Sequence, residues 1–533
     1  MASSDFEKHP SALRPTIIVF NLIVAILGAI IGIQLIVTLG ITPNTSIIGA
    51  LIAMILSRIP VRFFKQFRSL HEQNLVQTSI SSATFGAGNS LLIPIGIPFV
   101  MGTPELILPM LLGASLAMIS DATILFKVFD SKLFPAKGAW PPGVATAEAL
   151  IAGDQGGKRA GLLGIGTGLG LLGSYFGISM SAFGVAFIGN IWALTMFGVG
   201  LLLRGYSKPL FGFDINSLYV PHGFMIGAGI VALIQVILIV RKKQEAQKAD
   251  AHGEVLENLT RTEKDISQAF TYGFIAYLAI ALIIALTTGI ITKMSFGMLI
   301  VYLVFAAFAA FVHEIIVGIS AMHSGWFPAF AVALITLIIG MLIGFPPVAL
   351  ALMVGFSAST GPAFADMGYD LKTGYRIRGD GSNPELEKDG RKQQYITAIL
   401  AFVVAIIVVF FSHKGYFAAN LVPPVDRVYV ATIKAGASAE VARNLLLWAI
   451  PGAILQFVGG PNRQMGILLA TGLLIINPKA GWAVLAGIAI RAIVLKVKGK
   501  EAETPMSIMA AGFIAGDALY SFFSSVFTMR TKK

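Results

Sequence analysis

Long apolar runs separated by short polar segments dominate this chain. A helix needs about 20 apolar residues to cross a bilayer core of about 30 Å, because each backbone amide in lipid must be hydrogen-bonded within its own segment. Many runs reach that length, so the pattern predicts an all-α polytopic integral membrane protein with about 14–16 transmembrane or re-entrant helices. The clear candidate spans are residues 16–39, 46–60, 104–126, 160–176, 180–203, 220–240, 267–291, 295–320, 327–345, 395–412, 444–458, 464–476, 480–497 and 505–528.

Three further apolar stretches are interrupted by Gly, Pro, Ser or Thr, and we expect them to be broken or re-entrant helices. They cover residues 74–101, 141–153 and 346–364. Broken helix at membrane depth is tolerated where it lines a cavity or is buried in protein, and matched broken helices in two halves are typical of transporters. We therefore expect two membrane halves whose broken helices line a central substrate cavity.

Polar segments set the expected domain boundaries. Residues 241–265 mix both charge signs without an apolar core, which is typical of a solvated linker, and residues 370–394 form a second polar insertion. The predicted layout is an N-terminal cytoplasmic tail (1–13), a first membrane half (14–240), a charged cytoplasmic linker (241–265), a second membrane half (266–528) and a C-terminal tail (529–533).

Composition agrees with this class. Hydrophobic residues make up 56% of the 533 residues and charged residues 12%, against about 25% charged in a soluble domain. The net charge of +12 reflects Lys and Arg in short loops between apolar runs, as in cytoplasmic membrane loops, so we expect no nucleic-acid partner. We expect a multi-pass protein of the plasma or inner membrane. A cytoplasmic N-terminus would place Arg58, Arg62, Lys65 and Arg68 inside.

Several classes of site are excluded or disfavoured. The chain has no cysteine, and its seven histidines are scattered without close pairing, so we expect no metal site and no cofactor. His313 and Glu314 resemble the start of a zinc-protease helix, but the second histidine would fall at Val317. No Walker loop and no nucleophile constellation is visible, and we expect a protein that is not an enzyme. The polar start and the long first apolar run predict no cleavable signal peptide.

A polar stripe follows one predicted helix, in the segment "EQNLVQTSISSATFGAGNS" from Glu72. Helical spacing places its amides and hydroxyls on two neighbouring faces. Such groups avoid lipid, so they must face a solute cavity or, as the alternative, other helices. The candidate substrate-binding residues here are Gln73, Asn74, Gln77, Thr78, Ser81, Ser82 and the following Asn89.

A second candidate binding element lies in "AWPPGVATAEALIAGDQGGKRAG", residues 139–161. The pair Pro141 and Pro142 starts a helix of about two turns, which the following glycines end. It is either an interfacial loop helix with a solvated glutamate or a half-helix that dips into the protein and meets an anionic group. Thr146 and Glu148 lie on it and are candidate substrate ligands.

Ionisable groups inside apolar runs are candidates for proton coupling, because lipid-like surroundings favour a protonated carboxyl group. Glu314 is the first candidate, with His313 or His323 as partner. Asp517 and Asp121 follow. The alternatives are a structural hydrogen bond for Glu314 and an interfacial ion pair with Lys127 for Asp121.

A glycine string, "GIGTGLG", lies within an apolar span and follows no strand. Its small residues at four-residue spacing, Gly164/Gly168 and Gly166/Gly170, therefore predict close helix packing and not a dinucleotide site.

Four blocks together resemble the oligopeptide transporter (OPT) superfamily, as a prokaryotic member similar to its yellow-stripe-like branch. They are "HEQNLVQTSISSATFGAG" (71–88), "WPPGVATAEALIAGDQGGKRAG" (140–161), "FADMGYDLKTGYRIRG" (364–379) and "AAGFIAGDALYSFFSSV" (510–526). The resemblance implies a proton-coupled secondary transporter of small peptides or metal chelates, and a homodimer. The chain is shorter than typical plant members, and Val144 stands where Ser or Thr is common.

The predicted function is a proton-coupled symporter that imports small peptides or peptide-like solutes by alternating access. The alternatives are uptake of siderophore-like or nicotianamine-like metal chelates, a channel, and a membrane-embedded enzyme acting on lipid-linked substrates. A channel would more often show a repeated pore signature, and an enzyme would need a metal or nucleophile site that is not evident.

Overall fold

The computed structural model describes residues 8–39, 49–50, 69–246, 259–325, 327–436 and 438–531. Within these ranges strand structure is limited to one bridge between Phe129 and Phe134, which confirms the all-α class. The expected span 46–60 lies almost entirely outside the described residues, as do the central part of the expected linker and the four basic residues after that span: Arg58, Arg62, Lys65 and Arg68.

Nine helices or broken helices in the described ranges are long and apolar enough to cross a membrane, so the chain is a polytopic membrane protein. The bounds of the principal helices are α1 Pro15–Leu39, α3 Leu70–Phe85, α4 Ile93–Met101, α5 Ile107–Val128, α6 Pro141–Gln155, α7 Gly157–Tyr175, α8 Met180–Ile188, α9 Ile191–Phe211, α10 Val220–Ala246, α11 Glu263–Thr287, α12 Phe296–Ser324, α13 Ala329–Ile343, α14 Pro347–Ser359, α15 Pro362–Ile377, α16 Pro384–Ala418, α17 Pro424–Ala435, α18 Ala439–Arg463, α19 Met465–Leu474, α20 Pro478–Lys498 and α21 Glu503–Thr531.

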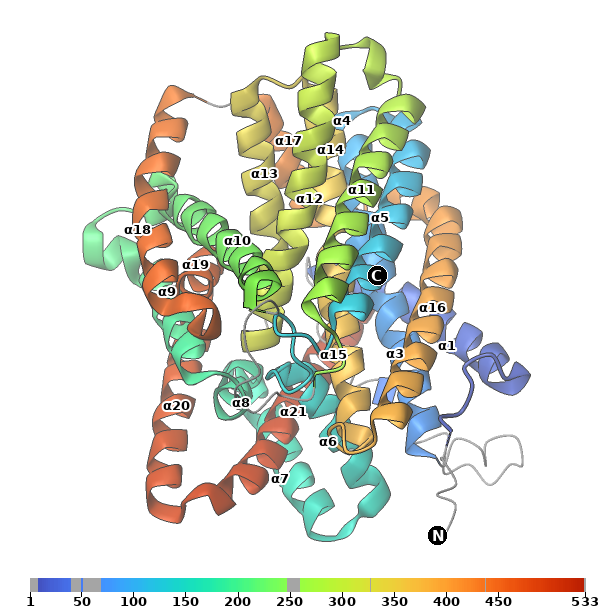
Figure 1. Cartoon of the computed structure of the whole chain (residues 1–533), viewed down its shortest axis with the longest axis vertical. Coiled ribbons are helices and arrows are strands. Elements are labelled where there is room, and N and C mark those ends of the chain that lie inside the picture. The colour runs from blue at the N-terminus through green and yellow to red at the C-terminus, as the bar shows by residue number, and fades with distance from the viewer. Residues whose placement is uncertain are drawn as a thin grey trace.

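The helices form two groups that lie side by side (Figure 1). In one group α1, α3, α4, α5 and α11 to α17 pack together; in the other, α10 packs on α18, α19 on α9, and α21 on α7 and α8. Helix α6 contacts α15 of the first group and α21 of the second. Both groups therefore combine helices from early and late parts of the chain.

Two broken helices run antiparallel through the first group. The span Leu70–Met101 contains α3, a π-helix at Gly86–Leu92 and α4, and the span Pro347–Ile377 contains α14 and α15. The second break lies at Gly361, whose φ of +90° suits glycine. Because α3 packs on α15 and α4 on α14, the two breaks face the same region. This confirms the broken helices expected within 74–101 and 346–364.

The expected single span 180–203 is wrong, because two helices, α8 and α9, occupy it. Gly189 is extended, and the side chain of Asn190 accepts hydrogen bonds from the amides of Trp192 and Ala193. That N-cap satisfies free amides at the start of α9 and so stabilises a new helix in the middle of an apolar run.

The polar insertion expected at 370–394 is largely helical. Its residues form the end of α15 and the start of α16, and many of them are buried. Arg378 and Glu387 are 3% and 1% exposed and form an ion pair with each other. These two charged residues are thus compatible with burial because they are paired across the turn that joins α15 to α16.

The glycine string packs as predicted on one face only. A Cβ atom at Gly166 would lie 2.5 Å from the carbonyl oxygen of Met509, and one at Gly170 would lie 2.7 Å from that of Phe513. Cβ atoms at Gly164 and Gly168 would meet no atom within 4 Å. The Gly166/Gly170 pair therefore brings α7 against α21, whereas the Gly164/Gly168 pair makes no such contact.

We predict that Gly166→Ala destabilises the protein by about 1–3 kcal/mol, because the new methyl group overlaps a backbone carbonyl that cannot move freely. Thermal unfolding in detergent measures the effect as a lower melting temperature. Gly164→Ala is the matched control, since its methyl group enters open space. Equal melting temperatures for the two variants would contradict this packing.

Candidate functional site

The polar stripe of α3 is buried in the protein and does not face lipid. Asn74, Gln77, Thr78, Ser81 and Ser82 have no exposed surface. The described helices that pack most closely against α3 are α1, α15 and α16. The structure therefore directs the stripe toward other helices, and protein groups occupy most of its hydrogen-bonding positions.

Two carboxylates on α15, Asp366 and Asp370, receive the donors of the stripe. Ser81 Oγ donates to Asp366 Oδ1 at 2.5 Å, and Gln77 Nε2 donates to Asp370 Oδ1 at 2.5 Å. Ser82 Oγ donates to Asp370 Oδ2 at 3.3 Å. Both carboxylates have no exposed surface. The α3–α15 interface is thus a buried cluster of amides, hydroxyls and acids.

Acceptors in this cluster remain available. Asp366 Oδ2 and Asn74 Oδ1 are buried without a hydrogen-bond partner in the described part of the chain, while Asn74 Nδ2 donates to Gln77 Oε1 at 3.0 Å. A buried acceptor without a donor is costly. A donor from a bound solute would satisfy these oxygens.

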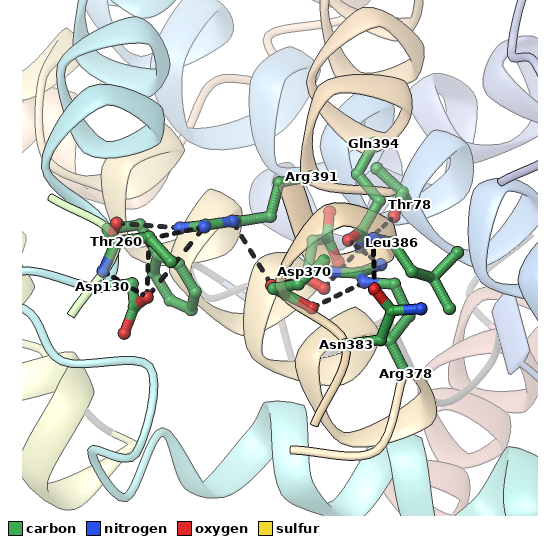
Figure 2. Close-up of polar contacts among 11 residues, drawn as sticks. Thr78, Asp130, Thr260, Asp370, Arg378, Asn383, Leu386, Arg391 and Gln394 are labelled. Atoms are coloured by element: carbon green, nitrogen blue, oxygen red, sulfur yellow. Dashed lines mark hydrogen bonds and ion pairs between the residues drawn. The ribbon is translucent and has the colours of Figure 1, made fainter. Parts of the chain in front are cut away.

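Gln394 of α16 connects the cluster to an ion-pair network (Figure 2). Its Nε2 donates to the carbonyl of Asp370 at 2.6 Å and to Thr78 Oγ1 at 3.3 Å, while its Oε1 accepts from Arg378 Nη1 at 2.9 Å. Arg378 also donates to both oxygens of Glu387, at 2.7 and 3.1 Å. The stripe, α15 and α16 therefore share one continuous set of hydrogen bonds.

The network continues across Arg391 to the segment before α11 (Figure 2). Arg391 Nε lies 3.3 Å from Glu387 Oε1, and Arg391 Nη2 donates to Thr260 Oγ1 at 2.6 Å. Thr260 Oγ1 donates to Asp130 Oδ2 at 2.6 Å. These contacts join α16, the loop after α5 and the start of α11 at one end of the molecule.

The N-terminal segment covers the same end. Arg14 Nη1 forms an ion pair with Glu72 Oε1 at 2.8 Å, and the amide of Ala12 donates to Gln393 Oε1 at 2.9 Å. Burial, assisted by the positive charge of Arg378, lowers the pKa of His9 to about 3. His9 is therefore neutral at physiological pH and adds no charge to the network.

A second acidic group lies at the start of α15. Glu314 of α12 accepts from the hydroxyl of Tyr277 at 2.5 Å, and Asp121 of α5 is a close electrostatic neighbour of both. Asp121 accepts from the amides of Gly361 at 2.9 Å and Phe364 at 2.7 Å. It thus caps the helix that carries Asp366 and Asp370 further along. The alternative of an interfacial ion pair between Asp121 and Lys127 finds no support among the described residues, where this buried carboxylate binds the two amides.

The chain matches the family profile described as "OPT oligopeptide transporter protein" over residues 15–240 and 218–528. The chain belongs to this family. OPT proteins transport oligopeptides or related solutes across membranes, so the functional class predicted from the sequence is confirmed at this level. No curated protein matches the chain.

The structure brings into the candidate site two residues that were not among the predicted ligands, Asp366 and Asp370. Both lie in the resembling block 364–379, but Asp370 is also the first residue of the expected polar insertion 370–394. Their four-residue spacing placed them on one helix face. This spacing could have marked Asp366 and Asp370 as candidates. Their partners on α3 are nearly 300 positions away and could not be identified from the sequence.

Helix α6 has 15 residues and is therefore longer than the expected two turns. Most of it is buried, so the alternative of a solvated glutamate is wrong. Glu148 is 1% exposed and binds Arg159 at 2.6 Å and Arg376 at 2.8 Å. Thr146 Oγ1 donates to the carbonyl of Pro142 at 2.9 Å. Both predicted ligands have protein partners here, and their contact with a solute stays a prediction.

The other predicted coupling residues lie apart from one another. Asp517 accepts from Ser174 Oγ and from the amide of Ser181 at 2.9 Å, which places it at the N-terminus of α8. His313 Nδ1 contacts the carbonyl of Ser357 on α14, so its described partner is not Glu314. His323 lies in the last turn of α12. Asn89 lies in the π-helix and is 9% exposed.

We predict that Glu387→Gln destabilises the transporter by about 3–5 kcal/mol, because two buried guanidinium groups, those of Arg378 and Arg391, lose their shared carboxylate. Unfolding in detergent monitored by circular dichroism measures this loss. Glu385→Gln is the matched control, since Glu385 is exposed on the same helix turn. A stability equal to that of the control would show that the network is not a structural clamp.

Proposed function

We propose that this OPT protein is a proton-coupled symporter that imports small peptides or peptide-like solutes by alternating access. The α3–α15 interface carries the proposal. It places buried amides, hydroxyls and two carboxylates between two antiparallel broken helices, the arrangement in which transporters bind solutes near the middle of the membrane.

The chemistry of the interface matches a peptide. Asp366 and Asp370 offer acceptors for an α-amino group, and Asn74 and Gln77 offer amide donors and acceptors that complement a peptide bond. In the structure Gln77 and Ser81 of α3 donate to Asp370 and Asp366 of α15, and Asn74 donates to Gln77 within α3. A solute that parts the helices exchanges protein hydrogen bonds for equivalent ones, so opening has a small net cost.

We assign the basic end of the molecule to the cytoplasm. The end of α15 carries Arg376 and Arg378 where the chain turns into α16, the first turn of α7 carries Arg159, and α20 ends with Lys496 and Lys498. These turns lie at the lower end of Figure 1, whereas the turn between α11 and α12 lies at the upper end. Excess Lys and Arg marks the cytoplasmic side, and a cell-membrane location follows from an import function.

Proton coupling is assigned to Glu314 with Asp121. Two carboxylates buried together retain a proton between them, because two adjacent negative charges in a low dielectric repel strongly. Asp121 also caps the N-terminus of α15, where the helix dipole favours negative charge. A change of charge at this pair therefore acts on the helix that carries the solute carboxylates.

Metal-chelate complexes are the alternative substrate class, because the sequence resembles the yellow-stripe-like branch. Groups of three or more His, Cys, Asp or Glu able to hold a metal are absent from the described residues. In this alternative the metal arrives within its chelator and is recognised through the chelator's amino and carboxylate groups. A homodimer is the proposed assembly, as the resemblance implies.

We predict that Glu314→Gln abolishes uptake driven by a pH gradient in proteoliposomes but leaves solute binding measurable. The amide oxygen of the new glutamine still accepts the hydrogen bond from the Tyr277 hydroxyl, but the amide cannot bind and release a proton as a carboxyl group does. Glu105→Gln, at an exposed position between α4 and α5, is the control. Normal gradient-driven uptake by the Glu314 variant would remove this coupling assignment.

We predict that Asn74→Ala and Gln77→Ala each lower the affinity for a bound peptide about fivefold to tenfold, since one net hydrogen bond contributes about 1 kcal/mol. Titration of peptides against thermal stabilisation of purified protein measures the affinity. Ser79→Ala is the matched control, because Ser79 lies on α3 but donates to the carbonyl of Asn21 on α1. Unchanged affinity in both variants would show that peptides bind elsewhere.

A further inference from the structure

Asp426 is a buried acid that the proposed mechanism does not use. It is the third residue of α17, and its side chain has no exposed surface. Neither carboxyl oxygen has a hydrogen-bond partner in the described residues. An ionised carboxylate is far more costly to bury without a partner than a neutral carboxylic acid. The surroundings of Asp426 therefore fit its neutral form.

Among the described residues, the helices that pack most closely against α17 supply no compensating charge. They are α4, α13 and α14, and none of the three contains an Asp, Glu, Lys, Arg, His or Tyr residue. The dipole of α17 favours a carboxylate in its first turn, but this effect is smaller than the cost of burial without a partner. All of the neighbouring helices thus favour the neutral acid.

The other charged and titratable side chains of α17 are exposed or bind groups other than Asp426. Arg427 is exposed and donates to Asn420 Oδ1 at 2.9 Å, and the hydroxyl of Tyr429 donates to the carbonyl of Phe330 at 3.1 Å. Lys434 is exposed in the last turn. Burial raises the pKa of Asp426 well above its usual range, and the charge of Arg427 opposes this shift only in part.

Gly96 of α4 provides the space that the carboxyl group occupies. A Cβ atom at Gly96 would lie 1.9 Å from Asp426 Oδ2 and 2.9 Å from its Cγ, so only glycine fits opposite this acid. Pro94 and Pro98 flank Gly96 on α4. Because Pro98 has no N–H, the carbonyl of Pro94 lacks its helical partner, and α4 bends more easily at this point.

We propose that Asp426 is a proton-binding site that latches α17 to α4. The neutral carboxyl group occupies the space opposite Gly96. When the group ionises, it moves out of this space into water, and α17 separates from α4. Helices α17 and α4 lie at the end opposite the basic turns (Figure 1). The assignment of this end to the outer side of the membrane rests on the proposed function. Proton binding by Asp426 and separation of α17 from α4 can be measured without transport.

The direction of the pH dependence follows from proton linkage. The closed latch holds one proton that the open latch releases, so low pH favours the closed form. Between the two pKa values of Asp426, in the open and in the closed form, each unit of pH increases the open-to-closed ratio up to about tenfold. Above the pKa of the closed form the ratio becomes constant.

Single-cysteine reporters test the latch, because the chain has no cysteine of its own. Val430→Cys places a thiol at a position of α17 that is 3% exposed, and Val428→Cys places one at a position that is 43% exposed. The rate of reaction with a water-soluble thiosulfonate is measured for both from about pH 6 to about pH 9. The ratio of the two rates cancels the common effect of pH on thiols and reports the opening of the latch.

We expect this ratio to rise with pH in the parent and to stay low and flat in Asp426→Asn, whose neutral amide mimics the protonated acid. Asp154→Asn, at an exposed carboxylate of α6, is the matched control and keeps the rise. Gly96→Ala gives a high ratio at every pH. A flat ratio in the parent, or a rise that persists in Asp426→Asn, overturns the proposal.

A second measurement tests the proposal even if the Asp426→Asn variant does not fold. Asp426→Leu also removes the titrating group, and its melting temperature in detergent should not fall with rising pH, whereas that of the parent should. A parallel fall in both proteins overturns the proposal. Neither measurement involves transport, so failure of the latch leaves the proposed transport function standing, and failure of peptide uptake leaves the latch standing.

Discussion

A polar group buried in a membrane protein must find its partner inside the protein, and this requirement governs the arrangement around α15. The helix starts with free amides at membrane depth, which the carboxylate of Asp121 satisfies. Its middle carries Asp366 and Asp370, which receive the side-chain donors of α3. Its end leads into Arg378, which Glu387 neutralises. Each contact fixes one neighbour of α15, and together they position the candidate site.

These contacts explain why α15 connects the functional parts of the molecule. A displacement of the helix changes the capping by Asp121, the bonds to α3 and the bond between Gln394 and Asp370 at the same time. Packed interfaces of this kind have few alternative arrangements, so small local changes are converted into movements of whole elements. A transporter that alternates between two states requires such an element.

The apolar pattern predicted the class of fold and most of the helices, because the length of a span is set by the bilayer and not by the neighbours of a helix. It failed where a local contact overrode hydrophobicity. Asn190 caps a new helix inside an apolar run, and Arg378 with Glu387 makes a charged stretch compatible with burial. Within the glycine string 164–170, the Gly166/Gly170 pair meets another helix and the Gly164/Gly168 pair does not. Spacing alone cannot choose between the two faces.

The sequence by itself determined a polytopic helical membrane protein of transporter character, with a polar stripe on α3 and acids inside apolar helices. Those properties depend on composition and local periodicity, which are readable along one chain. Only the tertiary structure decided that Asp366 and Asp370 face this stripe, that Asp121 caps α15 and that Asp426 meets Gly96. The members of each of these pairs lie at least 240 positions apart in sequence. Their partners are selected by the packing of whole helices, which no local pattern encodes.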